Sequence, residues 1–157
     1  MSGVPEVRLS MPARAEGVSV VRQALSGLAD ALDFDESVVA DMKMAVTEAC
    51  TNVVVHAYEQ ADGLLEVDML TAGDALTITV RDHGAGIHPR ATARRTPALG
   101  LGLPLIAALS DAFELRGSTG EGTEVRMTFS YERDGDPVEV NPVRGTVGSD
   151  GKWDPDA

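Results

Sequence analysis

The sequence predicts a two-layer α/β (α+β) sandwich, in which helices cover one face of a mixed, mostly antiparallel sheet. Two pairs of segments alternate apolar and polar residues, and a short glycine-containing turn joins each pair, which is the pattern of antiparallel hairpins. Longer segments before and between these pairs have the apolar content or spacing of helices. The resulting order is strand, helix, helix, strand, strand, loop, helix, strand, strand.

The first part of the chain supplies one short strand and two helices. Val4 to Ser10 alternates weakly, and Pro5 favours an edge position or a strand start because proline cannot donate to a sheet ladder. Apolar residues three or four apart predict an amphipathic helix over Ala15 to Leu32. Asp35 is a suitable N-cap for a central helix that runs from about Glu36 to Glu59.

The second part of the domain consists mainly of strands. Leu64 to Thr71 and Ala75 to Asp82 are predicted to be antiparallel neighbours, because only a three-residue turn separates them. His83 to Leu99 lacks apolar periodicity and predicts a long loop, and such loops in compact domains usually have a function. The remaining predicted elements are a helix over Leu101 to Ser110 and strands over Ala112 to Arg116 and Gly122 to Tyr131.

The predicted domain covers residues 1–131, and residues 132–157 form an acidic tail. The tail has seven acidic and three basic residues and is rich in Gly and Pro, which favours disorder. Its Trp153 is the only tryptophan of the chain and is either an interaction site or an incidental residue.

Composition narrows the class of protein. The net charge of −12 argues against a nucleic-acid-binding surface, which would need a basic patch. The only cysteine, Cys50, excludes an intrachain disulfide and is expected to be a small buried packing residue. No apolar run approaches the roughly 20 residues that a membrane span requires. The N-terminus has no signal-peptide pattern, so we expect a cytoplasmic protein without a membrane partner.

Within the central helix, the run from Ala45 to Tyr58 is mostly apolar and is interrupted by Glu48, Asn52 and His56. They are four residues apart, so they share one stripe of the helix. A buried polar stripe needs partners, because each unpaired polar group costs roughly 1–3 kcal/mol. An amide oxygen can ligate Mg²⁺ and a carboxylate can deprotonate a nucleophile, so the stripe suits a metal–phosphate group. The alternative is a core helix whose polar residues bond to neighbouring loops.

A carboxylate followed by two glycines ends the second strand of the first hairpin. Asp82 can accept a hydrogen bond from an exocyclic amine such as adenine N6, and Gly84 and Gly86 leave room for a flat base. An ordinary Asp–Gly turn at the end of a strand explains the same residues.

Two further glycine motifs follow. Gly100 and Gly102 are expected to open a helix with Pro104 in its first turn, where free N–H groups attract phosphate. Gly122 and Thr123 enter the last strand and bring a hydroxyl near a base. A plain loop-to-helix junction and a hairpin turn are the respective alternatives.

The order and spacing of these motifs resemble those of the GHKL-type ATPases, which include gyrase, Hsp90, histidine kinases and MutL-like proteins. The segments E-A-C-T-N-V-V-V-H-A-Y and G-L-G-L-P-L-I are most similar to the anti-sigma-factor serine kinases of bacterial partner switching. The resemblance covers about Val4 to Tyr131 and implies that the domain has the histidine-kinase-like ATPase fold and binds ATP. A P-loop is not an alternative, because the chain has no G-x-x-x-x-G-K-[ST] motif.

The resemblance also implies roles for individual residues. Glu48 would be the catalytic base, and Asn52 would ligate the Mg²⁺ that bridges the phosphates of ATP. The remaining cofactor-binding residues would be Asp82, Gly84 and Gly86 at the adenine, Gly100 and Gly102 at the phosphates, and Thr123 in support of the adenine site. His56 matches the family pattern but receives no chemical role.

The chain departs from the family pattern at one place. Members often carry an arginine just before the second glycine motif, where this sequence has Ala98 and Leu99. Arg94 and Arg95 lie a few residues earlier and either reach the site or form a solvated basic spot.

The function implied by the resemblance is an ATP-dependent protein serine/threonine kinase and anti-sigma factor. It would phosphorylate a small anti-sigma antagonist protein, sequester a sigma factor and form a homodimer. Because of the missing arginine, the alternative is an ATP-binding regulatory module with little or no kinase activity. A slow ATPase without a protein acceptor is a third option.

Overall fold

The computed structural model describes residues 7–58, 62–84, 96–118, 121–131, 146–147 and 153–154. Five strands form the main sheet: β1 (Val7–Pro12), β2 (Leu64–Ala72), β3 (Ala75–Asp82), β4 (Ala112–Ser118) and β5 (Gly122–Ser130). The helices are α1 (Ala15–Ala31), α2 (Glu36–Asn52), the π-helix η1 (Val53–Ala57) and α4 (Thr96–Leu109).

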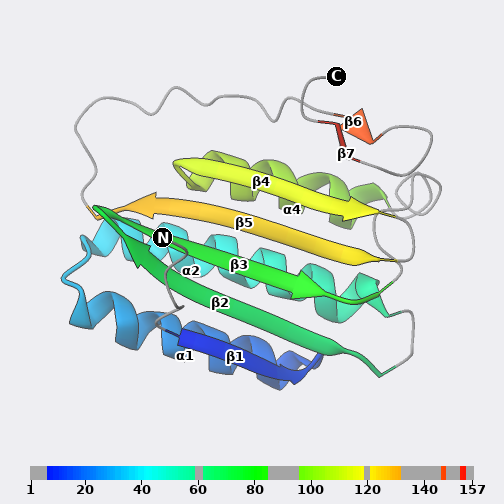
Figure 1. Cartoon of the computed structure of the whole chain (residues 1–157), viewed down its shortest axis with the longest axis horizontal. Coiled ribbons are helices and arrows are strands. Elements are labelled where there is room, and N and C mark those ends of the chain that lie inside the picture. Colours follow the sequence, from blue (N-terminus) through cyan, green and yellow to red (C-terminus); the bar gives the residue numbers. More distant parts are fainter. Residues whose placement is uncertain are drawn as a thin grey trace.

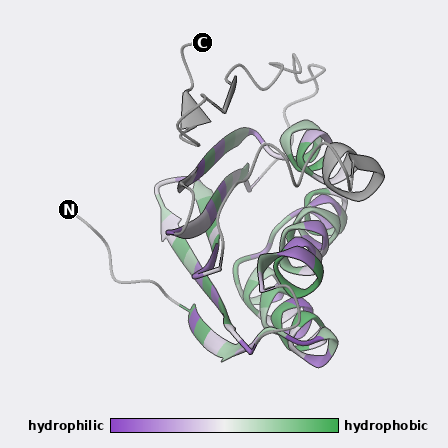
Figure 2. Ribbon diagram, turned by 90° about the vertical axis from the view of Figure 1, so that its right-hand side faces the viewer, coloured by the Kyte–Doolittle hydropathy of each residue, from purple (hydrophilic) through white to green (hydrophobic). Residues whose placement is uncertain are grey.

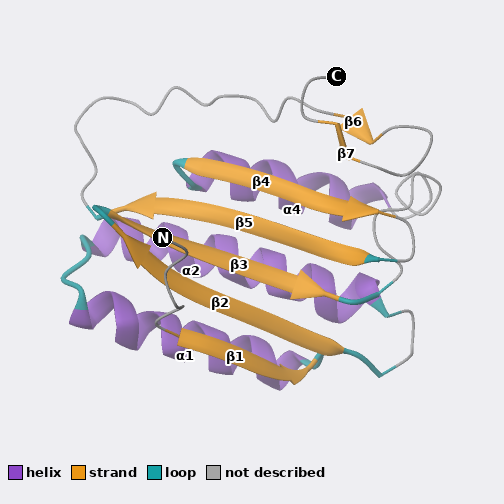
Figure 3. Ribbon diagram, in the orientation of Figure 1, coloured by secondary structure: helices purple, strands orange, loops and turns teal. Residues whose placement is uncertain are grey.

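The main sheet has the order β1-β2-β3-β5-β4, and each of these neighbouring pairs is antiparallel. The three α-helices lie on one face of this sheet (Figures 1 and 3). The predicted two-layer sandwich is therefore confirmed, with a sheet that is antiparallel throughout its described pairings rather than mixed. The β2–β3 hairpin and the edge position of the first strand are also confirmed.

The core lies between the helices and the sheet (Figure 2). Alternation along the strands directs every second side chain toward the helices, and Val and Met supply much of the packing because aromatics are only 4% of the chain. The fully buried large side chains include Val21, Leu25, Met42, Val46, Leu65, Val67, Met69, Leu76, Ile78, Ile106, Met127 and Phe129. Cys50 is buried among them, as predicted, and burial raises the pKa of its thiol to about 12.

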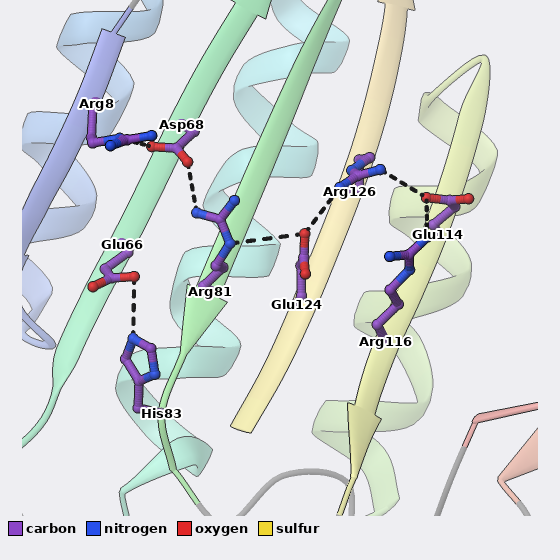
Figure 4. A network of polar contacts seen from close by, with 9 residues as sticks. All are labelled: Arg8, Glu66, Asp68, Arg81, His83, Glu114, Arg116, Glu124 and Arg126. Carbon is purple, nitrogen blue, oxygen red and sulfur yellow. Dashed lines mark hydrogen bonds and ion pairs between the residues drawn. The ribbon is translucent and has the colours of Figure 1, made fainter. Parts of the chain in front are cut away.

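The opposite face of the sheet is polar. A chain of ion pairs crosses all five strands on this face (Figure 4). Its most buried member is Asp68 on β2, which is 7% exposed and accepts hydrogen bonds from Arg8 (3.1 Å) and Arg81 (2.6 Å). Buried carboxylates require such partners, so these bonds explain how an acidic residue is accommodated within β2.

Several element boundaries differ from the predictions. The described part of the first strand is Val7–Pro12, and it ends two residues later than predicted because its register continues until Pro12 lies opposite Leu64. The predicted start at Val4 lies outside the described residues. The central helix begins at Glu36 with Asp35 in the N-cap position, as predicted. It then changes from α to π geometry at Val53, whereas the sequence predicted one regular helix as far as Glu59.

The prediction for the start of α4 is wrong. This helix begins at Thr96, so Gly100 and Gly102 lie inside it and Pro104 lies in its interior. Proline is well suited to the first helical turn, and Pro97 occupies that turn here. The glycines concealed this start because they lower helix propensity over the same residues.

Two short strands, β6 (Thr146–Val147) and β7 (Trp153–Asp154), pair with each other in the C-terminal segment. The remaining residues after position 131 lie outside the described part of the chain, so the disordered acidic tail remains a prediction. Among the helices that the structure describes, none has both the length and the apolar character needed to cross a membrane.

Candidate functional site

Two predicted site residues meet a third at the packed faces of α2 and α4. Glu48 and Asn52 are one helical turn apart on α2, and both side chains are half-buried. The buried backbone of Gly102 on α4 lies against both of them. A Cβ atom built at Gly102 would lie 3.0 Å from Asn52 Nδ2 and 3.4 Å from Glu48 Oε2. The arrangement therefore brings together a carboxylate, an amide and a peptide backbone that carries no side chain.

This close approach explains a glycine inside a helix. Glycine in a helix interior costs roughly 0.5–1 kcal/mol relative to alanine. At position 102, an alanine methyl group would crowd the Asn52 amide at a distance shorter than ordinary van der Waals contact. The absence of a side chain at Gly102 thus lets the backbone of α4 approach the polar atoms of Asn52 and Glu48 closely.

The donor chemistry at this position fits Mg²⁺ shared with phosphate. Asn52 offers an amide oxygen and Glu48 offers carboxylate oxygens, and oxygen ligands are those that Mg²⁺ prefers. The described residues contain no group of three or more His, Cys, Asp and Glu side chains that could hold a metal alone. A Mg²⁺ ion would therefore take most of its ligands from water and phosphate, as is usual for this ion in phosphate sites.

A second group of predicted residues lies at the end of β3. Asp82 continues the row of Leu76, Ile78 and Val80, so the period of two turns its carboxylate toward the helix layer. The carboxylate is 7% exposed and accepts a hydrogen bond from the backbone N–H of Gly84 at 2.9 Å. Thr123, its partner on β5, also donates its backbone N–H.

Burial raises the pKa of the Asp82 carboxyl, and the hydrogen bonds from Gly84 and Thr123 partly oppose this rise. A buried acid with a raised pKa at the end of a strand is a candidate functional group. Asp82 can act as a strong hydrogen-bond acceptor for a ligand that enters from the helix side.

Two glycines permit the close packing around Asp82. Gly122 has a φ of +84°, and a side chain there would clash with the backbone carbonyl of Asp82. Gly84 lies so close to the carbonyl of Ala57 that any side chain at position 84 would displace η1. Both glycines therefore hold the end of β3 in contact with its neighbours.

The two groups lie at one end of the sandwich. There, the C-terminal end of α2 and the end of β3 approach the beginnings of β5 and α4 (Figure 1). Gly84 against Ala57 links the β3 end to the helix that carries Glu48 and Asn52.

The other predicted residues have different outcomes. His56 lies in η1, where the wider π turn changes the spacing that placed it in line with Asn52. Gly100 lies within α4, as do Ala98 and Leu99. Gly86, Arg94 and Arg95 lie outside the described residues.

Sequence reasoning missed a role for Tyr58. Its hydroxyl accepts a hydrogen bond from the backbone N–H of His83 at 2.8 Å and donates one to the carbonyl of Leu64 at 2.5 Å. The available signal was a tyrosine at the end of the polar-striped helix, immediately before a turn. Its partners could not be inferred, because His83 is 25 residues away in the sequence.

Comparison with known proteins adds a family and a fold. Residues 11–129 match the family described as histidine kinase-like ATPase domain. The chain is 31% identical to a serine-protein kinase RsbW of Bacillus cereus, over 91% of this chain and 96% of that protein. The RsbW of Bacillus thuringiensis subsp. konkukian (strain 97-27) matches with the same identity and coverage.

One solved structure has the same fold. It contains the RsbU and RsbW domains of Rv1364c from Mycobacterium tuberculosis and superposes with a TM-score of 0.66 at 23% identity. The match covers 84% of this chain and 33% of that one, so this protein spans about a third of its length. At this identity the likeness concerns the fold alone.

Proposed function

This chain belongs to the histidine kinase-like ATPase domain family, and from that premise we propose that it is an ATP-dependent protein serine kinase. Its substrate would be a serine on a small anti-sigma antagonist protein. In its other partner state it would sequester a sigma factor. Similarity to proteins named serine-protein kinase RsbW, over 91% of the chain, supports this proposal.

The observation that carries the proposal is the approach of the Gly102 backbone to Asn52 and Glu48. This arrangement combines a metal-binding amide, a basic carboxylate and a backbone without a side chain, which are the groups that a phosphate-transfer site needs.

Each residue of the site has a proposed task. Asn52 would hold Mg²⁺, which neutralises charge on the phosphates of bound ATP. Asp82 would accept a hydrogen bond from the adenine amino group, with Thr123 beside it on β5. The glycines at positions 84, 86, 100 and 102 would allow the nucleotide to approach the backbone.

Glu48 would act as the general base. It would accept the proton of the acceptor serine hydroxyl as the serine oxygen bonds to the γ-phosphorus of ATP. The bond from that phosphorus to the β,γ-bridging oxygen breaks, so the products are phosphoserine and ADP. Glu48 is half-buried, and in the proposed complex its carboxylate would face the phosphates and the acceptor serine.

We propose that one surface of the protein binds either the sigma factor or the antagonist, and that the bound nucleotide determines which of the two is preferred. The nucleotide can shift the balance only by as much as its affinity differs between the two complexes. We propose that this exchange takes place in the cytoplasm on a homodimer.

Phosphotransfer tests the proposal. The protein is mixed with Mg·ATP and, in turn, with each small antagonist-type protein encoded by the same genome, and the acceptors are weighed by intact-mass spectrometry. A gain of one phosphate on a single acceptor, mapped to a serine, is the expected result. No gain on any acceptor would contradict kinase activity.

If no acceptor gains a phosphate, the geometry of α4 favours a second function, that of an ATP-binding regulatory module. Gly100 lies inside a helix that begins at Thr96, so its N–H is not among the free ones of the first turn. Ala98 and Leu99, where relatives in the resembling group often have arginine, lie in the same helix. An ATP-binding regulatory module without transfer would bind Mg·ATP measurably and leave every acceptor unmodified.

A further inference from the structure

Tyr58 connects three segments at the candidate site. It follows η1 directly, and its hydroxyl lies between the end of β3 and the start of β2. The hydroxyl oxygen accepts from the backbone N–H of His83 and donates its proton to the carbonyl of Leu64. The Tyr58 hydroxyl therefore acts both as an acceptor, for the residue after β3, and as a donor, to the first residue of β2.

The aromatic ring of Tyr58 is also closely packed. Gly63 lies against the Tyr58 ring so closely that a Cβ atom at position 63 would overlap it. The ring also packs against the hydrophobic core. Packing of the ring therefore sets the place from which the hydroxyl reaches His83.

His83 lies between Asp82 and Gly84, the residue whose backbone N–H bonds to the Asp82 carboxylate. Its backbone N–H bonds to Tyr58, and the next N–H, that of Gly84, bonds to Asp82 Oδ1 at 2.9 Å. Its side chain is held as well, because Nε2 lies 3.1 Å from the Glu66 carboxylate on β2 (Figure 4). The turn after β3 is thereby fixed from the helix on one side and from β2 on the other.

We propose that Tyr58 is a positioning residue for nucleotide-base selectivity. By fixing His83, it sets the place of the Asp82–Gly84 turn relative to the helix that carries Glu48 and Asn52. The Tyr58 hydroxyl thus adds a side-chain link to the backbone contact between Gly84 and Ala57, and both join the base end of the site to its phosphate end. This inference rests on the proposed function, because it assumes that the Asp82 carboxylate accepts a hydrogen bond from the adenine amino group.

A positioning role differs from a stabilising one in its consequences. Both hydrogen bonds of the Tyr58 hydroxyl are exposed to solvent, so water can replace the hydroxyl when it is removed. Tyr58→Phe keeps the ring in its place and removes only the hydroxyl. The folded protein is therefore expected to survive this substitution, with a turn that is less well fixed.

The test compares two nucleotides in wild type and in Tyr58→Phe by titration calorimetry. ATP carries the 6-amino group, whereas inosine triphosphate has an oxygen at that position and the same phosphates. Wild type is expected to prefer ATP, and Tyr58→Phe is expected to lower this preference roughly three- to tenfold, the size of one hydrogen bond. Affinity for inosine triphosphate should change much less, because the phosphate end does not depend on the turn.

Tyr131→Phe provides the matched control. Tyr131 follows β5 at the opposite end of that strand from Thr123 and stacks on Phe34 with ring centroids 4.3 Å apart. Its substitution should leave the preference for ATP unchanged. Hydrogen exchange without nucleotide adds a direct check, because the His83 amide should exchange faster in Tyr58→Phe than in wild type.

The outcomes separate this inference from the proposed function. An ATP preference that is as large in Tyr58→Phe as in wild type would overturn the role of Tyr58 alone. Equal losses of affinity for both nucleotides would do the same, because they would indicate a general structural effect. A wild-type protein that did not bind ATP would instead contradict the proposed function.

Discussion

The Gly102 backbone lies against the Asn52 side chain, at the position where an added Cβ would be 3.0 Å from Asn52 Nδ2. This contact joins α4 to α2 at the candidate phosphate site. It also makes position 102 a place where helix stability and the proposed function require different residues.

Gly102→Ala should therefore separate stability from activity. Alanine favours the helix by about 1 kcal/mol over glycine, so the free energy of unfolding should fall little or even rise. The new methyl group would push the Asn52 amide aside, and Mg·ATP affinity should fall about tenfold or more. Denaturant unfolding and titration calorimetry measure the two effects.

Gly27→Ala is the matched control for this experiment. Gly27 is an exposed residue of α1, and a Cβ there would have no atom within 4 Å. It should stabilise the protein without changing Mg·ATP affinity. If Gly102→Ala behaved in the same way, the contact with Asn52 would have no part in nucleotide binding.

Gly122→Ala should be more destabilising than Gly73→Ala. Both glycines have positive φ, +84° at Gly122 and +62° at Gly73, so each substitution costs about 1–2 kcal/mol in backbone strain. At Gly73 a side chain would meet open space, whereas at Gly122 it would clash with the Asp82 carbonyl. The difference between their unfolding free energies measures this contact, and equal losses would exclude it.

Asp82→Asn should weaken ATP binding without weakening the fold at neutral pH. Because the folded-state pKa of Asp82 is raised, folding favours its protonated form. Its ionisation therefore lowers stability as the pH rises from the ordinary Asp value of about 3.9 through the raised folded value. Asparagine removes this loss and can still accept the N–H of Gly84.

The stability difference between Asp82→Asn and wild type should accordingly grow in favour of the mutant over that pH interval and then level off. ATP affinity should be roughly tenfold lower in the mutant, since a charged acceptor is lost. Denaturant unfolding as a function of pH and calorimetry with ATP test the two statements. A mutant less stable than wild type at pH 7, with unchanged affinity, would contradict both.

The sequence predicted those features that depend on local pattern. The β2–β3 hairpin follows from a period of two, and the placement of Glu48 beside Asn52 follows from the helical period. In each case neighbouring residues determine the outcome.

Features that depend on tertiary contact could not be predicted in this way. The helix from Thr96 contains two glycines and an internal proline, which disfavour it locally, and its packing against α2 offsets them. The π turn at Val53 has no sequence signature. The bond between Tyr58 and His83 exists only because the fold brings the end of η1 to the end of β3.

Glu48→Gln compared with wild type tests the central claim, that this chain transfers phosphate with Glu48 as the base. The measurement is single-turnover phosphorylation of the acceptor by intact mass, with Mg·ATP affinity determined on the same samples. Glu36→Gln, an exposed change in the first turn of α2, is the matched control. We predict a loss of transfer of at least about a hundredfold in Glu48→Gln, near-normal ATP affinity and a fully active control. Transfer by Glu48→Gln at the wild-type rate would contradict the account.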